Sequence, residues 1–301
     1  MRGKWILCSL ALAVLVIRPV WANDTSSGDV NGTLVFMQQP NISMEKEVLL
    51  ISEHAVEVEY IFLNTGKASI NTQVTFPMPP IYIGISDHNS LDDFKLWVND
   101  KPQVTSQLLV VKMADGADIS SQFAQFNWTP AEVKAFVEDQ VAPAKKTPLP
   151  KAWFDQEGTP RFTMSYYYSW QQNFPAGQVT KVRHRYKPSV DTGVPMPAEL
   201  IVKDMMKQAC IDAATQAGIK KRESPVGINW AYLRYILLTA NNWQGPIKSF
   251  ELTIQKQHPQ QIISLCFDGE LKKIDPLRFR FSAKDFTPRQ DLNILFLAKP
   301  L

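Results

Sequence analysis

The sequence of 301 residues predicts a mainly β fold with a minor α content. Apolar and polar residues alternate at period two in many short segments, which is typical of strands with one buried face. Clusters rich in proline, glycine and asparagine separate these segments. We predict an antiparallel, β-sandwich-like domain at residues 23–190 with a helical and proline-rich insertion at about 115–158. An α+β domain at residues 191–301 follows, with a helix packed on a further antiparallel sheet.

Residues 1–22 have the pattern of an export signal. Basic residues precede an apolar run that ends at Ile17, and Val20-Trp21-Ala22 has the small-x-small pattern that signal peptidase accepts. The apolar run is about 13 residues long, whereas crossing a bilayer takes about 20. We therefore expect cleavage after Ala22, no stable membrane anchor afterwards, and a periplasmic or secreted chain.

The charge of the mature chain argues against a nucleic-acid partner. The full sequence has 32 basic and 29 acidic residues, and three of the basic residues (Arg2, Lys4 and Arg18) lie in the signal. Their removal leaves 29 basic residues, equal to the acidic ones. A neutral protein has no global electrostatic attraction to a phosphate backbone.

Cys210 and Cys266 are the cysteines that remain after Cys8 leaves with the signal. An exported protein with two cysteines normally pairs them, because its compartment is oxidising. The bridge would close a loop of about 56 residues and stabilise the fold by about 4 kcal/mol in the chain-entropy model. The alternative is two separate buried thiols.

The first half of the mature chain predicts a series of strands. Asn23–Asn31 is polar and should be a loose terminus. Every second residue of Val56–Phe62 is apolar; the chain then turns at Asn64–Lys67 and returns through Ile70–Phe76. The prolines that follow Phe76 should stop the pairing. Further strands are expected at residues 34–37, 47–52, 94–98 and 104–113.

The insertion at about 115–158 should carry one helix. Thr129 can cap it, Pro130 suits its first turn, and Glu132 completes a capping box. Trp128, Trp153 and Phe154 flank the proline-rich part. Their rings could contact a partner, or they could fix the insertion to the sheet.

The remaining elements place a helix among strands. A hairpin is expected from Phe162–Gln171 and Gln178–Lys187, and the proline-rich residues 188–197 mark a boundary. Leu200–Lys221 repeats its apolar residues at steps of three and four, which indicates one helix with Cys210 on its apolar side. The next segment predicts a second hairpin, made of Tyr232–Ala240 and Ile247–Ile254. Later strands are expected at residues 262–267, 277–281 and 292–297.

The sequence predicts no catalytic residue, no cofactor and no metal ligand. The four histidines are far apart, and no His-x3-His, Cys-x2-Cys or Gly-x-Ser-x-Gly string occurs. His184 shares a strand face with Val182 and Tyr186, so we interpret it as a half-buried structural residue. The polar loop Asp87–Asp93 could hold calcium or be a solvated turn, and it lacks the register of a known calcium loop.

Several strings along the mature chain occur together in one exported bacterial family. They are Tyr168-Ser169-Trp170, Phe174-Pro175-Ala176-Gly177, His184-Arg185-Tyr186-Lys187-Pro188, Asn242-Trp243-Gln244-Gly245-Pro246-Ile247, Cys266-Phe267-Asp268-Gly269 and Phe286-Thr287-Pro288, with Phe76-Pro77-Met78-Pro79 before them. In their order and spacing they resemble the family known as domain of unknown function 4424. The resemblance implies an envelope protein of Gram-negative bacteria without established catalytic residues.

These observations favour a non-catalytic binding or structural module of the cell envelope, whose partner is an unknown envelope protein or glycan. One alternative is an envelope hydrolase that uses dispersed Asp or Glu residues as acid and base. Another is the capture of a small periplasmic ligand.

Overall fold

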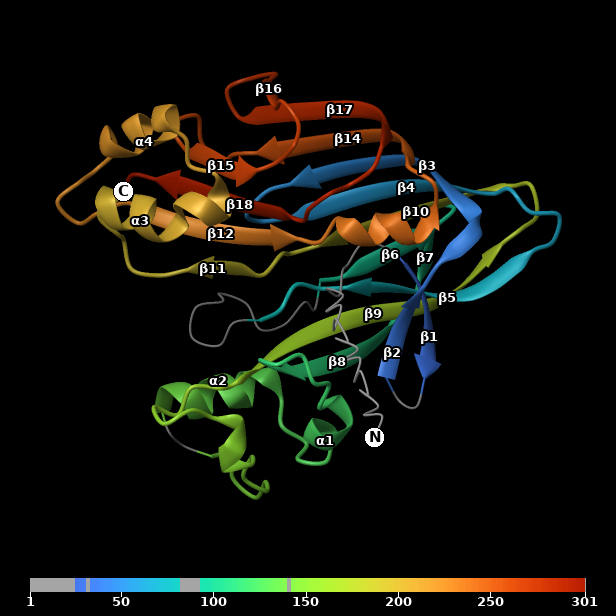
Figure 1. The fold of residues 1–301 in the computed structure, drawn as a ribbon, viewed down its shortest axis with the longest axis horizontal. Helices are drawn as coiled ribbons and strands as arrows, with labels where there is room; N and C mark the ends of the chain where they lie inside the picture. The colour runs from blue at the N-terminus through green and yellow to red at the C-terminus, as the bar shows by residue number, and fades with distance from the viewer. Residues whose placement is uncertain (1–24, 31–32, 82–92, 140–141, 301) are drawn as a thin grey trace, which may run out of the picture.

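The computed structural model describes residues 25–30, 33–81, 93–139 and 142–300 (Figure 1). The expected export signal, with its cleavage site after Ala22, lies outside these residues, and so does most of the polar loop Asp87–Asp93. The described chain is mainly β with a minor helical part, as predicted. Its strands form three sheets, here named A, B and C.

Sheet A forms the lower layer in Figure 1. Its strands in spatial order are β2 (Thr33–Met37), β1 (Thr25–Val30), β5 (Ile70–Pro77), β9 (Phe162–Phe174) and β8 (Ser106–Met113). All neighbours are antiparallel. The prediction of a loose terminus is therefore wrong from Thr25 onwards, because β1 pairs with both β2 and β5.

Sheet B is the upper layer and combines both halves of the chain. Its strands in spatial order are β16 (Lys272–Lys273), β17 (Arg278–Phe286), β14 (Ile247–Gln255), β3 (Gln39–Ile51), β4 (Val56–Asn64), β10 (Val179–Tyr186), β6 (Lys95–Val98) and β7 (Lys101–Gln103). The short β13 (Trp243–Gln244) also pairs with β3. Since β14 lies parallel to β3, residues beyond 191 share a sheet with residues before 190. The predicted boundary at 188–197 separates two sequence segments that contribute to one core.

Sheet C lies between sheet B and two helices. It contains β11 (Val190–Thr192), β12 (Asn229–Tyr235), β18 (Leu292–Ala298) and β15 (Ile262–Cys266), all antiparallel. In β18, Ile294 and Phe296 belong to the main core, while Leu295 and Leu297 pack with helices α3 (Ala198–Ala209) and α4 (Ala213–Lys220). This confirms the predicted packing of helical structure on a further antiparallel sheet.

The predicted single helix at 200–221 is divided into α3 and α4. Cys210 ends α3 with a φ of 49°, in the left-handed region. Asp212 then begins α4, since its side chain accepts a hydrogen bond from the backbone N–H of Thr215 at 2.7 Å. A residue in the left-handed conformation is a common helix end. Apolar spacing continues across the break, so the spacing alone could not reveal it.

Residues 114–161 form an excursion from the end of the β8–β9 pair. It contains α1 (Ser120–Ala124), α2 (Pro130–Asp139) and the short 3-10 helix η1 (Lys151–Trp153). The capping box at the start of α2 is confirmed. Thr129 N–H donates to Glu132 Oε2 at 2.7 Å, and Glu132 N–H donates to Thr129 Oγ1 at 3.2 Å.

The predicted hairpins are wrong, because the two strands of each pair lie in different sheets. β9 lies in sheet A and β10 in sheet B, and β12 lies in sheet C and β14 in sheet B. The segment expected to be one strand to Ala240 ends at Tyr235, before the 3-10 helix η2 (Leu238–Asn242). A period-two pattern shows which face of a strand is buried, but it does not show which strand pairs with it.

An aromatic cluster between sheets A and B forms the centre of the main core. His184 is fully buried there, deeper than the half-buried position predicted. Its ring centroid lies 5.0 Å from that of Phe76 and 5.4 Å from that of Trp170. The residue therefore packs in the core, as its structural interpretation requires.

Asn64 joins two of the connections between sheets A and B. Its fully buried side chain donates from Nδ2 to the carbonyl oxygens of Ala68 (2.9 Å) and Phe174 (2.8 Å). Its Oδ1 accepts from Gly66 N–H at 2.9 Å, and its own carbonyl oxygen accepts from Gly177 N–H at 2.9 Å. One residue thus ties the β4–β5 connection to the β9–β10 connection.

Replacing Asn64 by Ala should lower the free energy of unfolding by about 2–4 kcal/mol, because the buried carbonyl oxygen of Phe174 and the partly buried groups of Ala68 and Gly66 would lose their partner. Urea denaturation followed by circular dichroism measures this loss. Asn71→Ala is the matched control, since Asn71 is exposed in β5, and it should change stability by less than about 0.5 kcal/mol. Equal stability of the two variants would contradict the role of Asn64.

Candidate binding site

A cavity of about 380 Å³ opens at the end of β17. It lies between the segment that follows β15 and the loop that follows β17. Its lining residues are Phe267, Asp268, Phe281, Lys284, Asp285, Phe286, Thr287, Arg289 and Gln290. The volume is within the range of about 300–1,000 Å³ that small-molecule sites have. We refer to it as the phenylalanine cavity.

Three half-buried rings give the cavity its apolar surface. The rings of Phe267 and Phe281 meet edge to face at 4.8 Å between centroids, and those of Phe281 and Phe286 at 5.7 Å. Phe286 also stacks on the buried Phe250 at 4.5 Å, which joins the cavity to the main core. Because each ring packs against another, their positions are fixed before any ligand arrives.

Gly269 allows the rings to approach this closely. A Cβ atom at this position would lie 2.4 Å from the ring of Phe281 and 2.6 Å from that of Phe267. Carbon atoms do not approach to such distances, so a larger residue would displace a ring. The glycine in the string Cys266-Phe267-Asp268-Gly269 therefore has a packing function at the cavity.

Charges of both signs surround the rings. Asp268 and Asp285 supply carboxylates, and Lys284 and Arg289 supply cations. Lys248 Nζ lies 3.0 Å from Asp285 Oδ1, and Lys284 Nζ donates to Ser249 Oγ at 3.2 Å. Such a rim can bind polar groups of either sign around an apolar centre.

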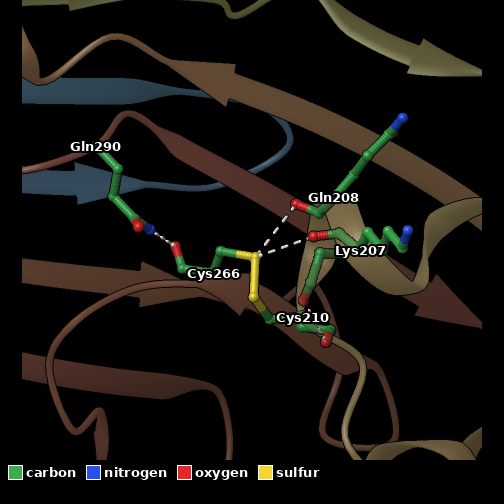
Figure 2. Close-up of a disulfide and its surroundings, with 7 residues drawn as sticks. Lys207, Gln208, Cys210, Cys266 and Gln290 are labelled. Carbon is green, nitrogen blue, oxygen red and sulfur yellow. Dashed lines mark hydrogen bonds between the residues drawn. A yellow bond between two sulfur atoms is a disulfide. The ribbon is translucent and has the colours of Figure 1, made fainter.

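The disulfide holds one wall of the cavity. Figure 2 shows the bond between Cys210, at the end of α3, and Cys266, the last residue of β15. Their Cα atoms are 4.8 Å apart, and the predicted pairing is confirmed. Phe267 follows Cys266 directly, so the bridge fixes the segment that carries the first ring. Cys210 is exposed to solvent and does not face the apolar side of the helix as expected, because it stands beyond the last turn of α3.

The carbonyl oxygens of Lys207 and Gln208 lie 3.4 and 3.6 Å from Cys266 Sγ (Figure 2). These are packing contacts, since a sulfur in a disulfide has no proton to donate. They place the last turn of α3 against the bridge.

The opposite wall is held by hydrogen bonds. Gln290 Nε2 donates to the carbonyl oxygen of Cys266 at 2.6 Å (Figure 2). Asn241 Nδ2 donates to the carbonyl oxygen of Pro288 at 3.0 Å. Asp291 Oδ1 accepts from the N–H groups of Leu237 (2.9 Å) and Leu238 (3.2 Å) at the start of η2. Burial raises the pKa of Asp291 although these two donors oppose the shift.

The aromatic residues predicted to contact a partner lie together in a second core, which forms between the excursion and strands β8 and β9. Trp128 is only 4% exposed and donates from Nε1 to the carbonyl oxygen of Thr147 at 2.9 Å. Trp153 is 9% exposed, and Phe154 is half-buried against Phe136. The rings of Trp153 and Phe154 lie 6.1 and 6.0 Å from that of Phe162 in β9, so they fix the excursion to sheet A and expose little surface. Their contact with a partner stays a prediction.

The described residues contain no group of three or more His, Cys, Asp or Glu side chains that could hold a metal ion. In the same part of the chain, no helix has the length and apolar character needed to span a membrane. Asp268 and Asp285 are the acidic residues that line the phenylalanine cavity.

A family model described as Domain of unknown function (DUF4424) matches residues 22–295. The chain belongs to this family. Two of the strings that carried the resemblance, Cys266–Gly269 and Phe286–Pro288, each contribute two residues to the lining of the phenylalanine cavity. These strings indicated the family in the sequence, but the sequence did not predict that Phe267, Phe281 and Phe286 form a site. No curated protein matches the sequence.

Matches among solved structures have low sequence identity and low structural similarity. A Legionella pneumophila protein proposed to bind nutrients has 15% identity and a TM-score of 0.48, with 92% of this chain and 70% of that chain covered. An M1 zinc metallopeptidase of Deinococcus radiodurans has 7% identity and a TM-score of 0.27, with 87% of this chain and 43% of that chain covered. Yeast LTA4 hydrolase has 8% identity and a TM-score of 0.28, with 86% of this chain and 29% of that chain covered. Similarity at these levels supports no inference about a ligand or an activity of this chain.

Replacing both cysteines by Ser should lower the free energy of unfolding by about 4 kcal/mol, because the unfolded chain regains the freedom of the closed loop. The sequence separation of that loop is 56 residues. Urea denaturation of the oxidised protein and of the double variant measures the difference. Reduced wild-type protein is the control and should match the variant; oxidised protein that unfolds at the same urea concentration as the variant would contradict the bridge.

Proposed function

We propose that this protein is a non-catalytic binding module of the bacterial cell envelope and that the phenylalanine cavity is its ligand site. The observation that carries the proposal is the set of three half-buried, mutually packed rings that line a cavity with charged residues around them. Partly exposed apolar groups that gather in one place commonly mark binding surfaces. The rigid rings offer contact area without a large cost in conformational entropy.

The envelope location rests on residues 1–22 and on the disulfide. The pattern of residues 1–22 predicts export, and disulfides persist in oxidising compartments such as the periplasm. A bridge that fixes one wall of the site is consistent with function in such a compartment. Both observations support an envelope role for the cavity.

The chemistry of the cavity favours a ligand with an apolar face and charged groups of both signs. Sugar rings and apolar side chains can pack against phenylalanine faces. Arg289 and Lys284 suit a carboxylate, and Asp268 and Asp285 suit an amine. Envelope glycan fragments that bear a short peptide combine these features in one molecule.

Peptide-bearing glycan fragments should raise the melting temperature of the purified protein, whereas uncharged oligosaccharides should have little effect. A ligand at 100 times its Kd stabilises the folded state by about 2.7 kcal/mol. Arg289→Ala and Phe267→Ala should reduce the shift, because each removes a group that lines the cavity. Thermal denaturation with each fragment measures it.

Arg161→Ala is the matched control, because Arg161 is an exposed arginine in the excursion, and this variant should keep the full shift. If none of the peptide-bearing fragments raised the melting temperature, the proposed ligand class would be wrong. A shift of unchanged size in both cavity variants would place the binding elsewhere.

Envelope glycan or peptide hydrolysis is the second candidate, because Asp268 and Asp285 line one cavity. Many glycoside hydrolases use two carboxyl groups, one as acid and the other as base or nucleophile. Release of new reducing ends from the same fragments, abolished by Asp268→Asn, would favour this candidate. Binding without turnover is the result that the binding module requires.

A further inference from the structure

Residues next to α4 and to the C-terminal end of β18 line a second cavity, of about 620 Å³. Figure 1 shows these two elements at the same end of the molecule. Three separate segments form the cavity: the residues after α4, the β14–β15 connection and the residues after β18. Its lining residues are Lys221, Arg222, His258, Gln260, Lys299 and Pro300. We refer to it as the basic cavity.

The ionisable side chains on this lining are all basic. Lys221, Arg222, His258 and Lys299 come from three segments, and no carboxylate occurs among the described lining residues. Lys221 and Lys299 are exposed and form no ion pair within the described chain. Cations gathered around a concave space produce a positive potential that attracts anions.

Arg222 has a structural role that also fixes its position. Its Nη1 donates to the carbonyl oxygen of Gly218 at 3.0 Å, within α4, and its Nε donates to the carbonyl oxygen of Gln260 at 2.7 Å. A cation at a helix C-terminus is favourable by itself, and this explains part of the basic character. It does not explain Lys299 or His258, which come from other segments. A guanidinium has five N–H groups, so several remain for a ligand.

Lys256 holds the loop that carries His258 and Gln260. It is 6% exposed, and its Nζ donates to the carbonyl oxygens of Pro259 and Gln261. Burial lowers the pKa of Lys256, and the neighbouring cations Lys273 and Arg222 lower it further. The positive potential of the cluster therefore extends to the residue behind the cavity wall.

Glu53 contacts this loop and is already engaged. Glu53 Oε2 accepts a hydrogen bond from Gln261 Nε2 at 2.6 Å. Its carboxylate interacts electrostatically with His258, but burial dominates and raises the pKa of Glu53. Glu53 thus fixes Gln261 and leaves the cations on the cavity side without a carboxylate in the lining.

We propose that the basic cavity is an anion site, independent of the phenylalanine cavity, that binds a small molecule through a phosphate or diphosphate group. Guanidinium and ammonium groups form strong charge-assisted hydrogen bonds to phosphate oxygens. The volume exceeds that of a phosphate group and leaves room for an organic part beside Pro300.

Inorganic pyrophosphate should bind the purified protein saturably at low salt, and isothermal titration calorimetry measures its Kd. The double variant Lys221→Gln/Lys299→Gln should weaken binding by at least about tenfold, since each substitution removes a charge-assisted contact. Both residues are exposed, so the fold should remain intact.

Lys67→Gln/Lys101→Gln is the matched control, because it removes two exposed lysines that lie outside the cavity. Its Kd should stay within about twofold of the wild-type value. Absence of saturable binding, or equal weakening in both double variants, would overturn the site. Citrate that binds as tightly as pyrophosphate would overturn the assignment to phosphate.

Discussion

The fold depends on the hydrogen bonds of Asn64, because they provide partners for backbone groups where the chain passes from one sheet to another. Some strands that follow one another enter different sheets, such as β4 and β5 or β9 and β10, so the connections between them cross the edge of the core. Backbone groups at such a crossing leave the regular hydrogen-bond ladder of their sheet and need other partners. The side chain of Asn64 supplies partners to Ala68, Phe174 and Gly66, while its backbone binds Gly177 and Gln178.

The same corner positions the strands that lead to the phenylalanine cavity. Thr65, next to Asn64, donates from Oγ1 to Gln244 Oε1 at 2.8 Å, and the ring of Trp243 lies 4.8 Å from that of Phe62. Trp243 and Gln244 form β13, directly before β14, and β14 pairs with β17. The corner is therefore connected through two neighbouring strands to the edge that carries the cavity, where the disulfide and the loop after β17 fix its walls.

Features that depend on neighbouring residues, such as buried strand faces and helix caps, could be predicted from the sequence. Contacts between distant segments could not. The alternation in Val56–Phe62 gave the correct buried face, and Thr129 with Glu132 gave a correct helix start. The hairpins were wrong because alternation contains no information about the sheet that each strand joins. Phe267, Phe281 and Phe286 look like ordinary strand residues in the sequence, and only the fold shows that their rings meet and stay partly exposed. Trp128 was noticeable in the sequence, but its position in a small core depends on contacts that cover it.

Native-state hydrogen exchange at the corner tests this account most directly. The N–H groups of Gly66 and Gly177 lie in connections, where amides usually exchange quickly through local opening. Because both donate to Asn64, we expect them to exchange only through global unfolding, at rates within about tenfold of those of the β4 amides. Exchange of these two amides orders of magnitude faster than that of β4 would show that the corner opens by itself and does not hold the sheets together.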